Sequence, residues 1–322
     1  MTLTRRHLLG TAALLLGRTA FAQADWPAKP VRIIVPAPAG GPFDRLIRPI
    51  AQDMQAALGQ PLVIDNQPSA GNIVGTRAGA MATPDGYTLV MTGMVNTITA
   101  ALHEKPGFDI VGDFVHISAI GEGAQWLVTR ADSGISSLAD LVARAKREPG
   151  KLSWASSGAG SSGHLLLELL QRAAGVQLIH VPYKGGAPAL NDALGGVVDL
   201  LAVPQNAAQS HVQSGKLRLL AVSSRARSPA APQAPTFAEL GYPQMTLTAW
   251  VGLSAPKGTP PEVVRKVHAA LAATLAKPAV VDPQIAEGLA ILKTTPDQYT
   301  ALVKGDTERW GALVRQLNLK AN

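Results

Sequence analysis

The feature that most constrains the fold is an apolar, β-branched run that leads through a glycine turn into a helical pattern. The run covers residues 31–35, the turn covers residues 36–41, and the helical pattern opens at Pro42. Val and Ile favour a buried strand, the Pro/Gly cluster ends it, and proline suits the first position of a helix. This order leaves several backbone N–H groups facing one concavity, as in an anion site built from main chain. An ordinary strand–turn–helix corner explains the same residues equally well.

A second segment repeats this order of strand, glycine loop and helix. Its strand covers residues 151–156, a Gly/Ser-rich loop follows at 158–163, and the helix opens at His164. Strands that alternate with helices at this spacing indicate a mainly parallel sheet. Two such units predict an α/β protein with two lobes around a cleft, each lobe a mainly parallel sheet flanked by helices.

The boundaries of the lobes follow from where the chain crosses between the units. Residues 114–129 have a Val/Ile-rich extended pattern, which we expect to be broken by Gly-Glu-Gly at residues 121–123. The crossings are expected near Gln125 and near Trp250. This gives two predicted lobes, residues 23–125 plus 250–322 for lobe 1 and residues 126–249 for lobe 2.

The length and composition agree with this organisation. The chain has 322 residues, of which 47% are apolar but only 4% aromatic, so the core is expected to consist of Ala, Val, Leu and Ile. The 31 Gly and 24 Pro suit a loop-rich α/β protein. The absence of cysteine excludes disulfides, thiol chemistry and a lipidated cysteine anchor.

The first 22 residues have the pattern of an export signal. Arg5 and Arg6 form a basic start, residues 8–16 are apolar, and Ala-Phe-Ala at 20–22 is a typical cleavage site. The apolar run is about half of the ~20 residues that a membrane-spanning helix needs. We therefore predict a signal peptide over residues 1–22, cleavage near Ala22, a periplasmic protein and no membrane insertion. The paired arginines fit the twin-arginine route and an ordinary secretory leader equally well.

The charge of the chain excludes some classes of partner. The formal charge of +7 includes three arginines of the leader, which has no acidic residue, so the mature chain carries +4. No Lys/Arg block is present that would bind nucleic acid or anionic lipid. A mild positive balance favours small anionic ligands instead.

The loop at 158–163 matches a dinucleotide-binding spacing, with glycines at 158, 160 and 163 between a strand and a helix. Such a site needs an acidic residue about 20 residues later, at the end of the next strand. That strand ends instead at Pro182, Tyr183 and Lys184. We therefore reject a nucleotide, expect no cofactor, and interpret the loop as a second backbone cradle for a carboxylate. The nearby polar side chains that could contribute are Ser156, Ser157, Ser161, Ser162 and His164.

Each of these side chains also has a purely structural interpretation. The serines are suited to capping the helix. His164, at a helix N-terminus, is expected to be a neutral donor or a packed ring. Asp44 lies in the first turn of its helix, where a carboxylate caps free N–H groups and would repel a bound anion. Lys184 could neutralise a ligand carboxylate or simply be solvated.

Sequence motifs for catalysis are missing. The chain has no Gly-x-Ser-x-Gly, no phosphate-binding loop with Gly-Lys-Ser/Thr, and no His-Glu-x-x-His. We predict that the protein is not an enzyme and binds no metal. A secreted hydrolase that uses Ser161 or Ser162 with His164 stays as an alternative, since such residues are assembled in space rather than in sequence.

From Trp26 to about Leu317 the chain resembles the Bug (Bordetella uptake gene) family, the periplasmic substrate-binding components of tripartite tricarboxylate transporters. The resemblance rests on ordered blocks along the chain: WPxKPVRIIVP from Trp26, GGxxD from Gly40, GNIxGT from Gly71, PDGYTL from Pro84, HVPYKG from His180, GKLR from Gly215, PTFAE from Pro235 and APxGTP from Ala255.

The resemblance implies a two-lobed, hinge-closing binding protein of type II-like fold. Its partners would be a small carboxylate ligand and the membrane subunits of the transporter. In the family, the loop after the first strand and the second-lobe loop hold the ligand carboxylate. Together with the two cradles, this predicts a ligand site made of Pro38, Gly40, Gly41, Pro42, Phe43, Met94, Ser156, Ser157, Gly160, Ser161, Ser162, His164, Tyr183 and Val203.

Two departures from the family pattern bear on the ligand. Many members have an aspartate where Val203 stands, and it looks positioned for a ligand ammonium, so its absence here predicts a carboxylate without an amino group. Phe43 replaces a small residue and, with Trp126 or Met94, would suit an aromatic or hydrophobic acid. The leading hypothesis is uptake of such an acid. A receptor of the same fold that reports to a two-component sensor is the alternative.

Overall fold

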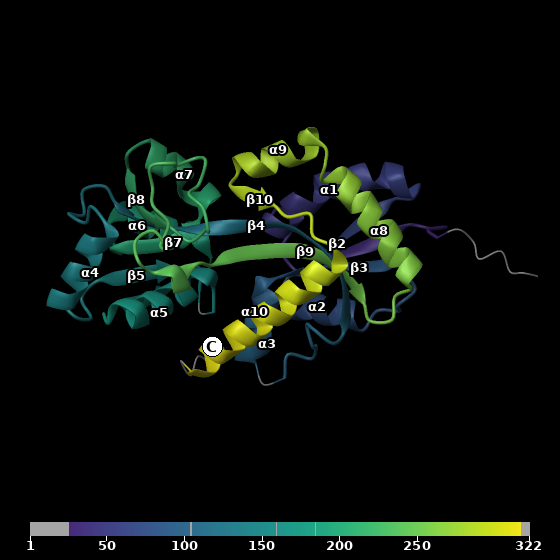
Figure 1. Ribbon diagram of the computed structural model, residues 1–322, viewed down its shortest axis with the longest axis horizontal. Helices are drawn as coiled ribbons and strands as arrows, with labels where there is room; N and C mark the ends of the chain where they lie inside the picture. The colour runs from purple at the N-terminus through teal and green to yellow at the C-terminus, as the bar shows by residue number, and fades with distance from the viewer. Residues whose placement is uncertain (1–25, 104, 159, 184, 317–322) are drawn as a thin grey trace, which may run out of the picture.

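The computed structural model describes residues 26–103, 105–158, 160–183 and 185–316, which form two α/β lobes on one ten-stranded sheet (Figure 1). The predicted signal peptide and Lys184 lie outside the described residues. Across the sheet the strand order is β2-β1-β3-β9-β4-β7-β5-β6, with β10 and β8 also paired to β4.

The outer strands of each lobe are parallel, as the alternation of strands and helices predicts. In lobe 1, β1 pairs in parallel with β2 and β3. In lobe 2, β5 pairs in parallel with β6 and β7. The elements of lobe 1 up to β3 are β1 (Val31–Val35), α1 (Pro42–Leu58), β2 (Leu62–Asn66), a 3₁₀ turn (Ala70–Asn72), α2 (Ile73–Ala80) and β3 (Thr88–Gly93). Those of lobe 2 include α4 (Leu138–Arg147), β5 (Ser153–Ser156), α5 (Ser162–Ala174), β6 (Ile179–Pro182), α6 (Gly186–Gly195), β7 (Leu200–Pro204) and β8 (Leu217–Val222).

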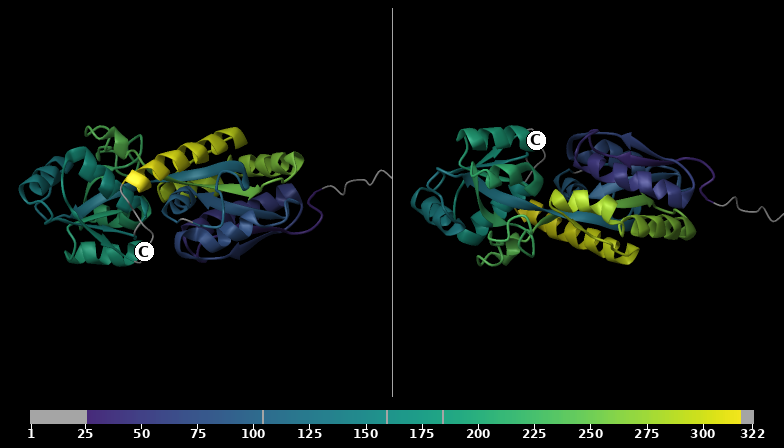
Figure 2. Two further views of the ribbon diagram at one scale, coloured as in Figure 1. Left: turned by 90° about the horizontal axis from the view of Figure 1, so that it is seen from below. Right: turned by 90° about the horizontal axis from the view of Figure 1, so that it is seen from above.

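Two long strands connect the lobes and run antiparallel to their neighbours. They are β4 (Phe114–Arg130) and β9 (Thr248–Pro256). β4 pairs with β9 through Ala124 and with β7 from Gln125 onwards, so one strand belongs to both lobes (Figure 2). The centre of the sheet is therefore antiparallel, which the prediction of mainly parallel sheets did not include.

The predicted break of β4 at residues 121–123 is wrong, since the strand is continuous there. Its glycines have another cause. A short strand, β10 (Leu289–Ile291), pairs with Gly121, Glu122 and Gly123. A Cβ on Gly121 would stand 2.6 Å from the Leu289 side chain. Glycine here permits close approach of another strand.

Two helices that line the centre of the molecule were not predicted. They are α3 (Met94–Leu102) and α7 (Gln205–Gln213), and each begins directly after a strand. No loop separates strand from helix, and the only local boundary signal is the last residue of each strand, Gly93 or Pro204. In α3 the N-terminus is fixed by Asn96, whose Oδ1 accepts the Gly93 N–H at 2.8 Å.

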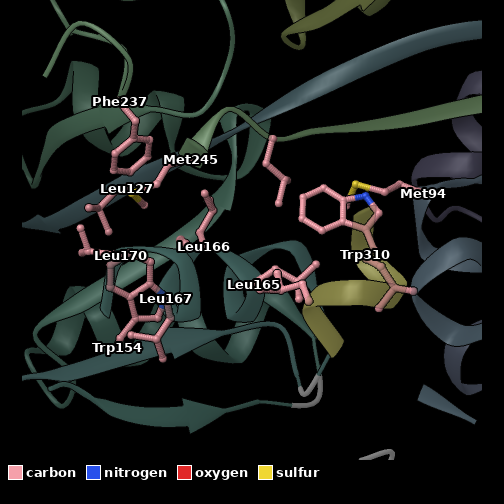
Figure 3. Packing of buried hydrophobic residues seen from close by; sticks show 14 of the residues in the cluster. Met94, Leu127, Trp154, Leu165, Leu166, Leu167, Leu170, Phe237, Met245 and Trp310 are labelled. Carbon is pink, nitrogen blue, oxygen red and sulfur yellow. The ribbon is translucent and has the colours of Figure 1, made fainter. Parts of the chain in front are cut away.

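The C-terminal segment covers lobe 1 and reaches the lobe junction. It contains α8 (Pro261–Thr274), α9 (Pro278–Ala286), β10 and α10 (Pro296–Gln316). Figure 3 shows Trp310 of α10 beside Met94 of α3, with Leu165 of α5 nearby. All three belong to one buried cluster that continues through both lobes. Within the described part of the chain, no helix is long and apolar enough to cross a membrane.

Candidate functional site

A cavity of about 410 Å³ lies where the two lobes meet. Lobe 1 contributes residues of α1, α3 and the turn between α9 and β10, and lobe 2 contributes the loop after β5 and the start of α7. Strand residues Ala124, Gln125 and Trp250, where β4 and β9 pass between the lobes, also line it. The cavity therefore changes shape with any change in the angle between the lobes.

Four helices point their N-termini at this cavity. The first residues of α1, α3, α5 and α7 all line it, and first-turn N–H groups have no partner within their own helix. Each N-terminus also carries about half a positive charge. The arrangement suits an anion held by main chain. The residues concerned are Pro42 and Phe43, Met94 and Val95, Ser161 and Ser162, and Gln205 and Asn206.

The glycine loop after β1 does not offer its own N–H groups to the cavity. The Gly40 N–H donates to Asp44 Oδ2 at 2.8 Å, and the Gly41 N–H donates to the Pro38 carbonyl at 3.0 Å. Pro38, Gly40 and Gly41 are not among the cavity-lining residues. Because Pro42 has no N–H, the first backbone N–H of a cavity-lining residue at this end is that of Phe43.

Asp44 has the structural role that its place in the first helical turn predicts. Its carboxylate is buried and accepts two bonds from Arg48, each 2.7 Å, and one from Asn66 Nδ2 at 2.9 Å. The hydrogen bond from Arg48 is the main reason that the pKa of Asp44 is lowered to about 2, and the bonds from Gly40 and Asn66 act in the same direction. Through these hydrogen bonds Asp44 connects the glycine loop, α1 and β2.

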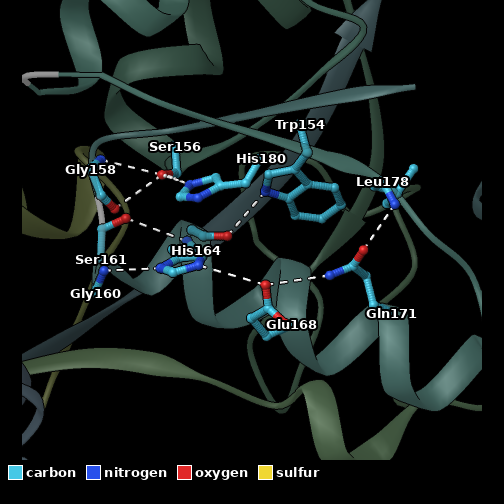
Figure 4. Close-up of polar contacts among 11 residues, drawn as sticks. Trp154, Ser156, Gly158, Gly160, Ser161, His164, Glu168, Gln171, Leu178 and His180 are labelled. Atoms are coloured by element: carbon cyan, nitrogen blue, oxygen red, sulfur yellow. Dashed lines mark hydrogen bonds and ion pairs between the residues drawn. The ribbon is translucent and has the colours of Figure 1, made fainter. Parts of the chain in front are cut away.

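The loop after β5 divides into residues that line the cavity and residues that support them. Ser157, Gly160, Ser161 and Ser162 line it. Ser156 is buried behind the loop, where its hydroxyl contacts His180 Nε2 at 2.7 Å and accepts the Gly158 N–H at 3.2 Å (Figure 4). Ser156 therefore shapes the loop and does not face the cavity.

His164 supports the same loop from beneath. Its Nδ1 accepts the Gly160 N–H at 3.0 Å, its Nε2 lies 3.6 Å from Glu168 Oε1, and its ring stacks on His180 with centroids 4.0 Å apart (Figure 4). Ser161 caps α5, since its hydroxyl accepts the His164 N–H at 3.4 Å. Both ring nitrogens of His164 thus face groups other than the hydroxyls of Ser161 and Ser162, so the alternative of a hydrolase that uses these serines with His164 finds no support in these contacts.

The histidine stack predicts a pH effect on stability. Burial is the main reason that the pKa of His180 is lowered to about 4, and the neighbouring His164 acts in the same direction. Glu168 opposes this shift. The Ser156 hydroxyl also faces the His180 ring. Because the unfolded pKa is near 6.5, the unfolded chain binds the proton first, and stability falls as pH decreases from about 6.5 towards 4. The free energy of unfolding should fall between pH 7 and pH 4.5 in both proteins. We expect this fall to be about 1 kcal/mol smaller in H180Q than in the wild type, after allowance for the partial exposure of the ring.

Urea unfolding at several pH values measures this difference. H211Q, which alters a histidine on α7 outside the stack, is the control and should follow the wild type. An H180Q variant with the same pH dependence as the wild type would contradict the assignment.

Besides Pro38, Gly40, Gly41, Ser156 and His164, two more predicted residues, Tyr183 and Val203, lie away from the cavity. The Tyr183 hydroxyl donates to Asp192 Oδ2 at 2.6 Å, and this bond is the main reason that its pKa is raised to about 12. Val203 is only 1% exposed and packs with Trp126 in the core of lobe 2. The residue at position 203 therefore gives no direct information on the charge of the cavity.

The apolar wall of the cavity includes the predicted Phe43 and Met94. It also includes Trp250, whose Nε1 donates to Asp306 Oδ2 at 2.5 Å. Leu46, Ile98 and Leu289 complete the wall. The wall of the cavity is thus mostly apolar, with serine hydroxyls at the start of α5 and the amides of Gln205 and Asn206 at the start of α7. Among the described residues, no cluster of His, Asp and Glu could hold a metal ion.

Sequence reasoning missed several lining residues, above all Arg45 and Glu287. Arg45 had a usable signal, because residues three apart share a helix face and Pro42 was already a candidate. Glu287 had none, since only the fold brings the end of α9 to α1. The same is true of Asn206, whereas Trp250 had a signal, because the chain was expected to cross between the lobes near it.

Comparison with known proteins identifies the family. Residues 46–319 match the family model described as tripartite tricarboxylate transporter family receptor. Protein BugT of Bordetella pertussis is 36% identical over 324 aligned residues, which cover 99% of each chain. These matches confirm the resemblance to the Bug proteins.

Solved structures agree with the family and with the fold. Rpa4515 of Rhodopseudomonas palustris, solved with adipate, has 30% identity and a TM-score of 0.80 over 92% of this chain and 99% of its own. MatC from the same organism, solved with bound malate, has 29% identity and a TM-score of 0.77 over 90% and 100%. The predicted two-lobed binding-protein fold is confirmed, and these relatives are solute-binding proteins rather than enzymes. The chain therefore belongs to the tripartite tricarboxylate transporter receptor family.

Proposed function

We propose that the protein is an exported, periplasmic receptor that captures a small organic carboxylate with an apolar or aromatic body. It delivers this ligand to the membrane subunits of a tripartite tricarboxylate transporter. The observation that supports this most strongly is the convergence of four helix N-termini on an otherwise apolar cavity. Residues 1–22 serve as the signal peptide in this proposal.

The carboxylate would lie between the lobes. The first turn of α1 supplies N–H groups from lobe 1, and the loop containing Ser157, Ser161 and Ser162 supplies N–H and hydroxyl donors from lobe 2. A ligand that bridges both lobes favours the closed form, because only that form makes both sets of contacts. The lobe boundaries 23–125 plus 250–322 and 126–249 fit this closure, with the hinge where β4 changes partners after Ala124.

A ligand without an amino group is favoured by the charges around the cavity. An ammonium group needs an unpaired carboxylate, and the acid that lines the described cavity, Glu287, faces Arg45 at 3.9 Å. The apolar body would lie against Phe43 and Trp250. Relatives have been solved with adipate and with malate, which supports carboxylate binding in general.

A thermal-shift comparison of acids with their neutral amides tests this function. We expect phenylacetate or hexanoate, at 100 times its Kd, to stabilise the protein by about 2.7 kcal/mol. For a protein of this size, that raises the melting temperature by roughly 4–5 °C. The corresponding amides should give no shift, because the helix N-termini attract charge. Equal shifts with acids and amides would contradict the proposal, and so would glutamate or phenylalanine as the strongest ligand.

A further inference from the structure

Two opposite charges line the rim of the cavity, and they face each other. Among the described lining residues, Arg45 and Glu287 are the charged ones, with Arg45 Nη2 3.9 Å from Glu287 Oε2. Their side chains are about half exposed, at 52% and 53%. Arg45 Nη1 also donates a long bond, 3.4 Å, to the Gly40 carbonyl. The polar residues around them, such as Gln205, Asn206 and Gln284, carry no charge.

The turn that carries Glu287 is held where the lobes meet. Gly288 follows it with φ of +90°, and a Cβ on Gly288 would stand 2.4 Å from the side-chain amide carbon of Gln205 in α7. The Gln205 amide is itself fixed, since Ser228 donates to its Oε1 at 2.8 Å. The backbone of this turn is therefore packed closely against α7 of lobe 2, and it places Glu287 beside Arg45.

We infer that the Arg45–Glu287 pair makes the site selective for monocarboxylates over dicarboxylates. The inference rests on the proposed function, because it assumes that one carboxylate binds at the helix N-termini. A monoacid then places its apolar body against Phe43 and Trp250 and leaves the pair intact.

A dicarboxylate meets a different situation. Its second carboxylate would need Arg45, the cation of the described lining, and would have to displace Glu287 from it. The Glu287 carboxylate would then lie a few ångströms from the second carboxylate of the ligand, and two like charges at this distance repel each other. The apolar wall offers no replacement cation. Glu287 thus repels the second carboxylate of a diacid. Arg45 pairs with Glu287 and so reduces its repulsion of the carboxylate bound at the helix N-termini.

Titration calorimetry with matched acids tests the inference. The probes are two pairs that differ by one carboxylate, hexanoate with adipate and benzoate with terephthalate. We expect the wild type to bind the better monoacid at least tenfold more tightly than its diacid. E287Q should reduce this ratio at least tenfold, mainly by tightening diacid binding, because it removes the repulsion and frees Arg45. R45Q should weaken diacid binding further, because Glu287 is then unpaired.

The control variant is E148Q. Glu148 ends α4 in lobe 2 and faces Arg144 at 4.0 Å, so E148Q makes the same charge change in a similar exposed pair. It should leave the ratio unchanged. Exposed pairs contribute little to folding, so all three variants should melt within about 2 °C of the wild type.

The outcomes separate the two proposals. A wild type that binds diacids as tightly as monoacids, or an E287Q variant with the wild-type ratio, overturns the selectivity inference while leaving carboxylate binding intact. A wild type that binds none of the four acids, nor any other monocarboxylate, overturns the proposed function and this inference with it.

Discussion

Replacing Asp44 by asparagine is expected to lower the free energy of unfolding by about 2–3 kcal/mol, the cost of breaking a buried, charge-assisted network. The carboxylate accepts bonds from Gly40, Arg48 and Asn66 and is almost completely buried. Asparagine leaves at least one of these donors without an acceptor. The loop before α1 would loosen with it, so ligand affinity should also fall. Urea unfolding at pH 7 measures the loss of stability.

The effect of Asp44 should depend on pH. The pKa of its carboxyl is about 2 in the folded protein, against 3.8 in the unfolded chain. A lowered pKa means that the stabilisation is complete above about pH 4 and is lost as pH falls towards 2. The difference between wild type and D44N should therefore shrink over this range.

Asp65 provides the control for Asp44. It lies in β2 and pairs with Arg32 at 3.5 Å, with both side chains at least one-third exposed. D65N should lower the free energy of unfolding by less than 1 kcal/mol, because exposed ion pairs contribute little to stability. If D44N cost no more than D65N, Asp44 would not be the residue that ties this corner together.

Replacing Ser162 by proline is expected to weaken ligand binding about 10- to 100-fold while the protein stays folded. Ser162 is the first residue of α5, a position that proline favours. The preceding Ser161 already has φ of −70° and ψ of 161°, the conformation that a residue before proline adopts. The change removes the N–H of a residue that lines the cavity. A hydrogen bond to a charged group contributes about 1.5–3 kcal/mol, which gives the expected loss.

S162A separates the backbone contact from the hydroxyl contact. It keeps the N–H and removes only the side-chain oxygen, so its loss should be clearly smaller than that of S162P. Calorimetry with a monocarboxylate gives both affinities, and thermal melting checks that α5 is intact. If S162A lost as much as S162P, the hydroxyl rather than the main chain would hold the ligand.

Much of the fold could be predicted from local sequence patterns. β1, α1 and α5 are bounded by residues that end or begin an element, such as Gly59 after α1 and Gly175 after α5, both in the left-handed conformation. α3 and α7 were missed because each follows its strand directly, with only Gly93 or Pro204 at the boundary. The break predicted within β4 is wrong because the glycines there allow β10 to pair with β4, and no local pattern reveals this pairing.

The candidate site divides in the same way. The loop around Ser161 and Ser162 is contiguous in sequence, so its pattern of glycine, serine and helix start could be recognised, and the loop lines the cavity. The loop at Gly40 shared that pattern, but its N–H groups are used by Asp44 and Pro38, a detail that depends on side-chain geometry. The pairing of Arg45 with Glu287 joins the two ends of the chain and requires the folded structure.

A crystal structure of the protein with a bound monocarboxylate would show which groups hold the charge of the ligand. We expect the carboxylate within hydrogen-bonding distance of the N–H groups at the starts of α1 and α5, with the rest of the ligand against Phe43 and Trp250. Arg45 should still face Glu287. A ligand whose carboxylate lies on Arg45 at the rim, or one bound outside the cavity, would contradict this expectation.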